Sequence, residues 1–251
     1  MRIGVYGLGR FGYFWAGLLS RYFEVWGYSR SSSRKTPPGV KRSSEDEILE
    51  CEVIFFAVSI SSFKGVLQRV RDRIKPGRLV IDTCSVKVFP AKWMESILPE
   101  GVKIIASHPM FGPDSASSGL VGLPMILWPL RDSEREFEYW RSFFEEIGLK
   151  VFKMEPHAHD REAAFTQGIT HYLGRVIADL GLKESPIGTL GYKKLLEIMT
   201  QTCNDPWQLF IDLQRYNPYT SEMRARLHAS IDKIMAQLDA IEIPGERPEG
   251  E

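Results

Sequence analysis

The chain has 251 residues, of which 43% are hydrophobic and 25% charged, which is typical of a globular protein of one or two domains. Its 32 basic and 32 acidic side chains give a formal net charge of zero, so no overall field would attract nucleic acid or an anionic membrane. Three scattered cysteines, Cys51, Cys84 and Cys203, exclude a disulfide framework or a zinc site, and we expect no metal.

The segment after Met1 enters a strand pattern at once and shows no apolar leader, so we expect a cytoplasmic protein. The scattered cysteines also fit a reducing compartment. No apolar run approaches the roughly 20 residues that a membrane-spanning helix needs. We therefore expect a small-molecule substrate, with neither nucleic acid nor membrane as a partner.

The first predicted strand covers residues 2–6 and ends in Gly7-Leu8-Gly9-Arg10-Phe11-Gly12, after which a helical pattern runs to about Arg21. This is the G-x-G-x-x-G spacing in its required place between a strand and a helix. The first glycine makes the tight turn, the second lets the backbone approach a pyrophosphate, and the third lets the helix pack against the sheet. The motif predicts dinucleotide binding by residues 7–12; the alternative is a glycine-rich turn that binds nothing.

The second predicted strand, residues 23–28, ends without the acidic residue that a NAD enzyme usually places there for the ribose 2′-hydroxyl. The loop that follows is rich in hydroxyls and cations instead. Arginine binds phosphate oxygens in a forked geometry and hydroxyls add hydrogen bonds, which suits a 2′-phosphate. We predict NADP as the cofactor, and a solvated basic loop is the alternative. The loop residues expected to contact NADP are Ser29, Arg30, Ser31 and Arg34.

Strands and helices continue to alternate as far as residue 154. The expected strands are 51–58, 79–82, 102–106, 125–128 and 149–154, and the expected helices are 44–50, about 59–73 and 133–147. Such alternation predicts an α/β fold with a Rossmann-type, doubly wound and mostly parallel sheet. Val58 and Ser59 follow one of these strands and should lie under the cofactor.

Two strand ends are expected to carry the chemistry. Ser85 follows the strand at 79–82, and Ser107-His108-Pro109-Met110-Phe111-Gly112-Pro113 follows the strand at 102–106. Pro109 biases His108 toward an extended conformation, and the Gly-Pro pair then forces a turn. This holds a histidine at the carboxyl edge of the sheet, where open α/β sheets bind ligands.

After Pro156 a helical period dominates almost to Ile241. We expect a cofactor domain over 1–155, a smaller all-helical substrate and dimerisation domain over 156–242, and a flexible tail over 243–251. One long helix is expected over 157–180. Its polar stripe of Gln167, His171 and Arg175 either faces a cleft or forms a hydrogen-bonded group in the core.

Collected together, these residues resemble the prephenate and arogenate dehydrogenases of tyrosine biosynthesis, most of all the NADP-dependent arogenate dehydrogenases of plant type. The resemblance covers about residues 2–230. It implies oxidative decarboxylation of arogenate or prephenate with hydride transfer to NADP, giving tyrosine or 4-hydroxyphenylpyruvate and CO2. Its carriers are residues 7–12, 82–87 and 107–113, His159-Asp160-Arg161, Ala163-Ala164, Gln167-Gly168-Ile169-Thr170-His171, Ser185-Pro186-Ile187 and Gly191-Tyr192.

The resemblance also implies roles for individual residues. His108 would be the general base for the ring hydroxyl, with Ser85 orienting the reacting groups. Gln167 and His171 would hold the hydroxyl or the carboxylates. Thr202 and Asp205 would favour arogenate, because a carboxylate pairs with the ammonium that prephenate lacks; capping of the next helix is the alternative role for Asp205.

The chain departs from many bacterial members where they carry a Thr-Arg pair, because the corresponding residues here are Thr200-Gln201. The cation that holds the side-chain carboxylate of the substrate is therefore open. Arg175, Arg215 and a residue of a partner subunit in a homodimer are the candidates.

Two other functions are compatible with parts of the pattern. A β-hydroxyacid dehydrogenase or an imine reductase also joins an NADP domain to helices, but the former needs a lysine on the face that carries Gln167 and His171. A non-catalytic NADP-sensing protein would keep the glycine motif and the basic loop without needing Ser85, His108 and His171 together.

Overall fold

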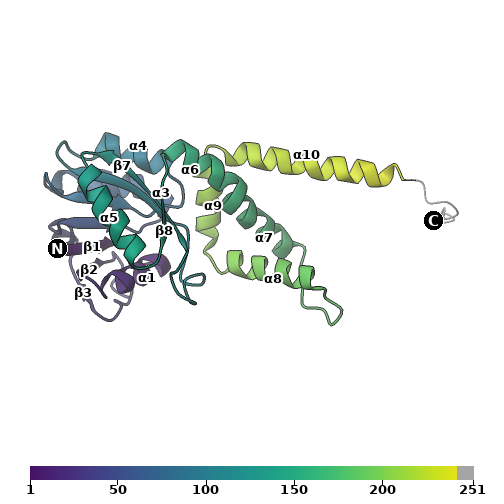
Figure 1. Ribbon diagram of the computed structural model, residues 1–251, viewed down its shortest axis with the longest axis horizontal. Coiled ribbons are helices and arrows are strands. Elements are labelled where there is room, and N and C mark those ends of the chain that lie inside the picture. Colours follow the sequence, from purple (N-terminus) through teal and green to yellow (C-terminus); the bar gives the residue numbers. More distant parts are fainter. Residues whose placement is uncertain (242–251) are drawn as a thin grey trace.

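In the computed structural model, residues 1–241 are described, and the tail expected over 243–251 lies outside them. A sheet with helices on its faces forms one part of the molecule, the helices of residues 156–216 form the other, and the helix Thr220–Asp239, labelled α10, projects away from both (Figure 1). The elements of the first part are β1 (Arg2–Tyr6), α1 (Arg10–Leu19), β2 (Glu24–Tyr28), β3 (Val40–Arg42), α2 (Glu45–Leu49), β4 (Val53–Phe56), α3 (Ile60–Val70), β5 (Leu79–Asp82), α4 (Val88–Ile97), β6 (Lys103–Pro109), β7 (Pro124–Arg131), α5 (Glu134–Glu146) and β8 (Lys150–Lys153).

The sheet has eight strands in the order β3-β2-β1-β4-β5-β6-β7-β8. All neighbouring strands are parallel except β6 and β7, which pair antiparallel. The strand order reverses between β1 and β4, which makes that point the switch where doubly wound sheets bind ligands. The predicted Rossmann-type, mostly parallel fold is therefore confirmed.

The short edge strand β3 was not predicted from the sequence. It has three residues, of which Lys41 and Arg42 are exposed, so it lacks the apolar run that marks the other strands. Its place at the edge of the sheet explains this composition, because an edge strand needs little apolar surface and cations there discourage pairing with other chains.

Helices cover both faces of the sheet and bury it completely near its centre. Along β4, Ile54 and Phe56 belong to one apolar cluster, while Val53 and Phe55 belong to the other. Successive side chains of a strand point to opposite faces, so a strand buried on both faces has no polar alternation. This accounts for the unbroken apolar run that predicted a central strand here.

The helical part consists of α6 (Pro156–Ala163), α7 (Ile169–Asp179), α8 (Leu190–Cys203), α9 (Trp207–Tyr216) and α10 (Thr220–Asp239). The expected boundary at residue 155 lies in the connection between β8 and α6, and it stays a prediction. None of the described helices is long and apolar enough to cross a membrane.

The prediction of a single regular helix over 157–180 is wrong in one respect, because a π-helical turn, Ala164–Gly168, separates α6 from α7. Gly168 in this turn lies close to Thr220 of α10, and its carbonyl accepts a hydrogen bond of 2.9 Å from Gln214. These contacts come from distant parts of the chain, so the local helical period could not reveal the extra residue. Such turns often occur at functional sites, and this one includes Gln167.

Candidate active site

The glycine motif has the geometry that its spacing predicts. Gly7 has a φ of +109°, and a side chain there would collide with the carbonyl oxygen of Ala57. A side chain on Gly12 would likewise collide with the carbonyl oxygen of Gly7, whereas one on Gly9 would meet open space. The turn is thus tight at its first glycine, close-packed at its third, and open at its second, where a pyrophosphate can approach the N-terminus of α1.

The loop after β2 is held by a residue that sequence reasoning missed. Arg42, on β3, donates hydrogen bonds of 2.9 to 3.0 Å to the backbone carbonyls of Ser29, Ser31 and Arg34. These contacts use the guanidinium of Arg42 to shape the loop. Arg34, in the same loop, lines the cavity that is described next. The structure places Ser29, Arg30 and Ser31 in this loop but outside the cavity lining.

A cavity of about 630 Å³ opens between the carboxyl edge of the sheet and the helical part. It brings together residues that the sequence places far apart, including Ser85, His108, Gln167 and His171. Of the other predicted site residues, Gly7, Leu8 and Arg175 do not line it, and Leu8 is buried in the core. The remaining predicted site residues in the lining are Gly9, Arg10, Phe11, Gly12, Arg34, Val58, Ser59, Thr202 and Asp205.

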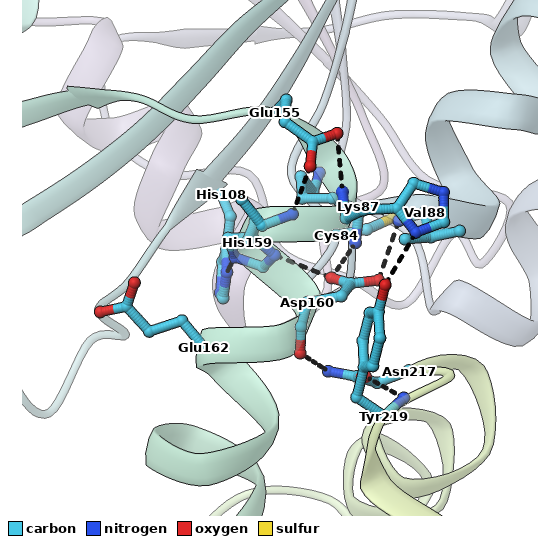
Figure 2. Close-up of polar contacts among 12 residues, drawn as sticks. Cys84, Lys87, Val88, His108, Glu155, His159, Asp160, Glu162, Asn217 and Tyr219 are labelled. Carbon is cyan, nitrogen blue, oxygen red and sulfur yellow. Dashed lines mark hydrogen bonds and ion pairs between the residues drawn. The ribbon is translucent and has the colours of Figure 1, made fainter.

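His108 lies at the end of β6 and begins a chain of buried hydrogen bonds (Figure 2). Its Nδ1 is 2.9 Å from Nε2 of His159, and Nδ1 of His159 is 2.8 Å from Oδ1 of Asp160. A carboxylate oxygen accepts hydrogen bonds, so Nδ1 of His159 donates to Asp160, and in the neutral tautomer of His159 its Nε2 accepts from Nδ1 of His108. The network therefore leaves Nε2 of His108 without a proton and able to accept one.

Burial lowers the pKa of His108 well below its usual value, and the nearby His159 and Lys87 lower it further. The neutral imidazole that the hydrogen bonds require is therefore also the form that the environment favours. Asp160 is completely buried, and its carboxylate accepts hydrogen bonds of 2.6 Å from the Lys87 amide and 2.9 Å from the Val88 amide. The hydrogen-bonded chain His108–His159–Asp160, called the relay below, thus ends at backbone amides of the N-terminus of α4.

A buried ion pair supports the same strand end from behind. The Lys87 ammonium contacts the Asp82 carboxylate and the carbonyl oxygen of Ser107, and both charged side chains are almost inaccessible to solvent. Asp82 also accepts a hydrogen bond of 2.9 Å from the Ser107 amide. This pair fixes the backbone of the residue directly before His108.

Two polar side chains of the helical part, Gln167 and His171, line the cavity, and each has one unpaired polar atom buried beside it. Oε1 of Gln167 and Nδ1 of His171 are buried and have no hydrogen-bond partner among the described residues. Burial lowers the pKa of His171, although Asp205 acts in the opposite direction. Buried polar atoms are rarely left unpaired, so these two side chains have unused hydrogen-bonding capacity next to the cavity.

Asp205 does not cap the helix that follows it, because the N-cap of α9 is Pro206 and that end has no side-chain cap. The alternative role as a helix cap is therefore wrong. Its carboxylate instead lies 2.9 Å from Nη1 of Arg10, across the cavity. The Arg175 guanidinium donates to the backbone carbonyls of Thr202 and Asp205, so it positions this segment from outside the cavity.

Thr202 lines the cavity, but its hydroxyl donates a hydrogen bond of 2.8 Å to the carbonyl of Ile198 in its own helix. The side chain also packs tightly against Gly174 of α7, where a larger residue would collide with it. In this arrangement Thr202 sets the contact between α7 and α8.

Sequence reasoning did not give His159, Asp160, Lys87 or Arg42 a place in the site. The first three belong to motifs that carried the family resemblance, and that resemblance was the only sequence signal for a role in the site. Their hydrogen-bond partners lie in other elements of the chain. Within residues 1–241, no group of three or more histidine, cysteine or acidic side chains could hold a metal ion.

Family models match both parts of the chain. The model of the prephenate dehydrogenase nucleotide-binding domain matches residues 22–153, and that of the TYRAAT1-like C-terminal domain matches residues 176–247. Arogenate dehydrogenases 1 and 2 of Arabidopsis thaliana, both chloroplastic, are 34% and 32% identical over 95% of this chain. The chain spans 39% of the first relative and 70% of the second.

Solved structures with the same fold include a prephenate dehydrogenase of Aquifex aeolicus in complex with hydroxyphenyl propionate and NAD+. That structure aligns with a TM-score of 0.76 at 17% identity, over 96% of this chain and 92% of that chain. Synechocystis arogenate dehydrogenase aligns with a TM-score of 0.67 at 20% identity, over 95% of this chain and 93% of that chain.

Proposed function

The chain belongs to the prephenate and arogenate dehydrogenase family, and we propose that it oxidatively decarboxylates arogenate, and prephenate less well, with NADP as cofactor. The observation that carries this proposal is the His108–His159–Asp160 relay, which presents an unprotonated nitrogen to the cavity beside the glycine turn. Arogenate would give tyrosine and CO2, and prephenate would give 4-hydroxyphenylpyruvate and CO2.

In the proposed mechanism His108 serves first as base and then as acid. When bound, NADP supplies the acceptor for the hydride of the ring carbon that bears the hydroxyl. Nε2 of His108 takes the hydroxyl proton, and the imidazolium is stabilised through His159 by the Asp160 carboxylate. The ring carboxylate then leaves as CO2, its electron pair aromatises the ring, and His108 returns the proton to the ring oxygen.

The cavity lining supports a division of labour around this centre. Ser85 lies at the end of β5, next in the sheet to the strand that carries His108, so its hydroxyl can orient the reacting oxygen. Gln167 and His171 line the cavity from the helical part. Two walls of different domains would thus hold one ring between them, which is how orientation contributes to catalysis.

A preference for arogenate is supported by Asp205, a carboxylate in the cavity lining. The ammonium of arogenate would pair with it, whereas the keto group of prephenate would leave this carboxylate without a cation from the substrate. We expect Asp205→Asn to lower kcat/KM for arogenate by about 10- to 100-fold and that for prephenate by much less. Parallel assays with both substrates measure the ratio, and an unchanged ratio contradicts the assignment.

The NADP preference is supported by Arg34, whose side chain lines the cavity in a loop that carries no acidic residue. We expect Arg34→Gln to lower kcat/KM for NADP by about tenfold while leaving that for NAD nearly unchanged, because only NADP carries the 2′-phosphate. Initial rates with each cofactor test this. An equal loss with both cofactors would place Arg34 outside the 2′-phosphate site.

The alternative NADP oxidoreductases are not favoured. Residues 156–179, which form α6, the π-helical turn and α7, contain no lysine, and a β-hydroxyacid dehydrogenase needs one there. A non-catalytic NADP sensor would not require the buried relay at His108. Turnover of arogenate or prephenate with NADP by the purified protein decides among these functions.

We also propose that the protein forms a homodimer through its helical part. Ile231, Ile234, Met235 and Leu238 are exposed on α10 and follow the spacing of one helical face. Such an apolar stripe on a projecting helix is suited to a second copy of the chain. The cytoplasmic location stays a prediction, and the Arabidopsis relatives are chloroplastic proteins.

A further inference from the structure

Arg10, which lines the cavity, bridges two carboxylates. Its Nη1 lies 2.9 Å from Oδ1 of Asp205, and its Nη2 lies 2.5 Å from Oδ1 of Asp114. Arg10 is the first residue of α1, whereas Asp205 lies between α8 and α9, so the pair joins the cofactor domain to the helical part. Since the three side chains are 27% to 44% exposed, the bridge can be opened by a ligand.

The Asp205 side of this bridge is firmly placed. The Arg175 guanidinium donates 2.8 Å and 3.1 Å hydrogen bonds to the carbonyls of Asp205 and Thr202, and it lies over the Trp207 ring. Arg175 therefore holds the backbone of this segment and does not line the cavity, although its Nε has no hydrogen-bond partner among the described residues. This removes one of the two named cations that the sequence left as candidates for binding a substrate carboxylate.

The Arg10 side supplies the cation that the site otherwise lacks. Gln201 lines the cavity at the position where many bacterial members of the family carry arginine, and Arg215 does not line it. In the described part of the cavity lining, the only arginine or lysine side chains are Arg10 and Arg34. Arg34 belongs to the loop assigned above to the 2′-phosphate, so Arg10 is the cation beside Asp205.

We propose that Arg10 and Asp205 form a clamp for an amino-acid head group, with the substrate ammonium on Asp205 and its carboxylate on Arg10. This inference rests on the proposed function and names the residue that replaces the missing arginine. An Arg–Asp ion pair is a template for a zwitterion, because an inserted ammonium and carboxylate give each charge a new partner of opposite sign. Asp114 would meanwhile hold the other edge of the guanidinium in place.

A second observation in the same cavity also points to a ligand. His171 is only 8% exposed, and its Nδ1 has no partner among the described residues. Arg10, Asp205 and His171 all line this one cavity, so the clamp and His171 belong to one site. The backbone amide of Arg10 takes no part in the bridge and stays available to a pyrophosphate at the N-terminus of α1.

The test uses Arg10→Gln and Asp205→Asn, with Arg141→Gln as a matched control. Arg141 also bridges two carboxylates, those of Glu138 and Glu145, but it lies on the exposed face of α5. Calorimetry measures the binding of L-tyrosine, which has the full head group, and of 4-hydroxyphenylpropionate, which has the carboxylate alone. Fluorescence titration measures NADP binding independently.

For Arg10→Gln we expect both ligands to bind about 10- to 100-fold more weakly, and KM for arogenate to rise similarly at saturating NADP. Asp205→Asn should weaken only L-tyrosine, and Arg141→Gln should weaken neither. NADP affinity should change less than about threefold in all three variants, since side-chain contacts to the substrate are the ones removed.

Three results would overturn the clamp, of which two concern Arg10→Gln alone. One is an Arg10→Gln variant that loses NADP affinity and keeps its affinity for both ligands, which would make Arg10 a cofactor residue. The other is a variant that binds L-tyrosine more tightly, which would make Arg10 a competitor for Asp205. If the wild-type protein turns over neither arogenate nor prephenate, the proposed function fails, whereas normal turnover with unaffected variants removes only the clamp.

Discussion

Replacing His108 with asparagine is expected to lower kcat by about 10²- to 10⁴-fold, the usual contribution of a general base. Asparagine can still donate a hydrogen bond to Nε2 of His159, but it cannot accept a proton at the position of His108 Nε2. Because the change leaves the glycine turn untouched, NADP binding should remain close to that of the wild-type protein. Steady-state rates with arogenate and a fluorescence titration with NADP measure the two quantities.

His157→Asn is the matched control, since His157 lies on the same helix as His159 but is exposed and contacts Tyr219. It should keep nearly full activity. Full activity in the His108 variant would remove the proposed mechanism while leaving the family assignment intact.

The pH profile gives an independent check on the same residue. His108 must be neutral to accept a proton, and its pKa in the folded protein lies well below the usual value. The kcat/KM should therefore stay flat as pH falls through about 6.5, the ordinary histidine pKa, and should drop only at more acidic pH. The free energy of unfolding should also fall at acidic pH. In the unfolded chain His108 becomes protonated near its ordinary pKa of about 6.5, whereas in the folded protein it stays neutral to lower pH. The folded state therefore loses stability relative to the unfolded state as pH falls below about 6.5.

Replacing Lys87 with methionine is expected to lower the free energy of unfolding by about 3 to 5 kcal/mol. The change removes one partner of a fully buried ion pair and leaves the Asp82 carboxylate without its cation. It also removes the contact to the carbonyl of Ser107, so the strand end that carries His108 would lose a support. Urea denaturation measures the loss.

Lys103→Met is the control for this change. Lys103 also pairs with a carboxylate, that of Glu136, but the pair is partly exposed and should contribute at most about 1 kcal/mol. Combining Lys87→Met with Asp82→Asn removes both charges and should recover part of the stability. A Lys87 variant as stable as the Lys103 variant would show that the buried pair is not needed.

The general architecture could be predicted from the sequence because it depends on local signals. Apolar runs bounded by turn residues marked the buried strands, and the glycine spacing marked the cofactor turn at residues 7–12. A strand end indicated His108 and a polar helical stripe indicated Gln167 and His171, and the structure brings all three to one cavity. Where local signals were weak, as in the exposed edge strand β3, the sequence reading failed.

The hydrogen-bond partners in the site could not be predicted in the same way. His108 and His159 are 51 residues apart, and Arg10 and Asp205 are 195 residues apart. No periodicity or spacing reports such pairs, because they form only when separate elements pack together. The π-helical turn at Ala164–Gly168 could not be predicted for the same reason. Gly168 in this turn contacts α9 and α10, which lie far from it in the sequence.

The sequence by itself determined which residue types stand at the carboxyl edge of a Rossmann sheet, since the strand ends follow from local patterns of burial and turns. Only the tertiary structure decided what those residues do to one another. It placed His159 behind His108, Lys87 beneath Ser107 and Arg10 against Asp205. The physical reason is that hydrogen bonds and ion pairs act over a few ångströms of space, whatever the separation along the chain.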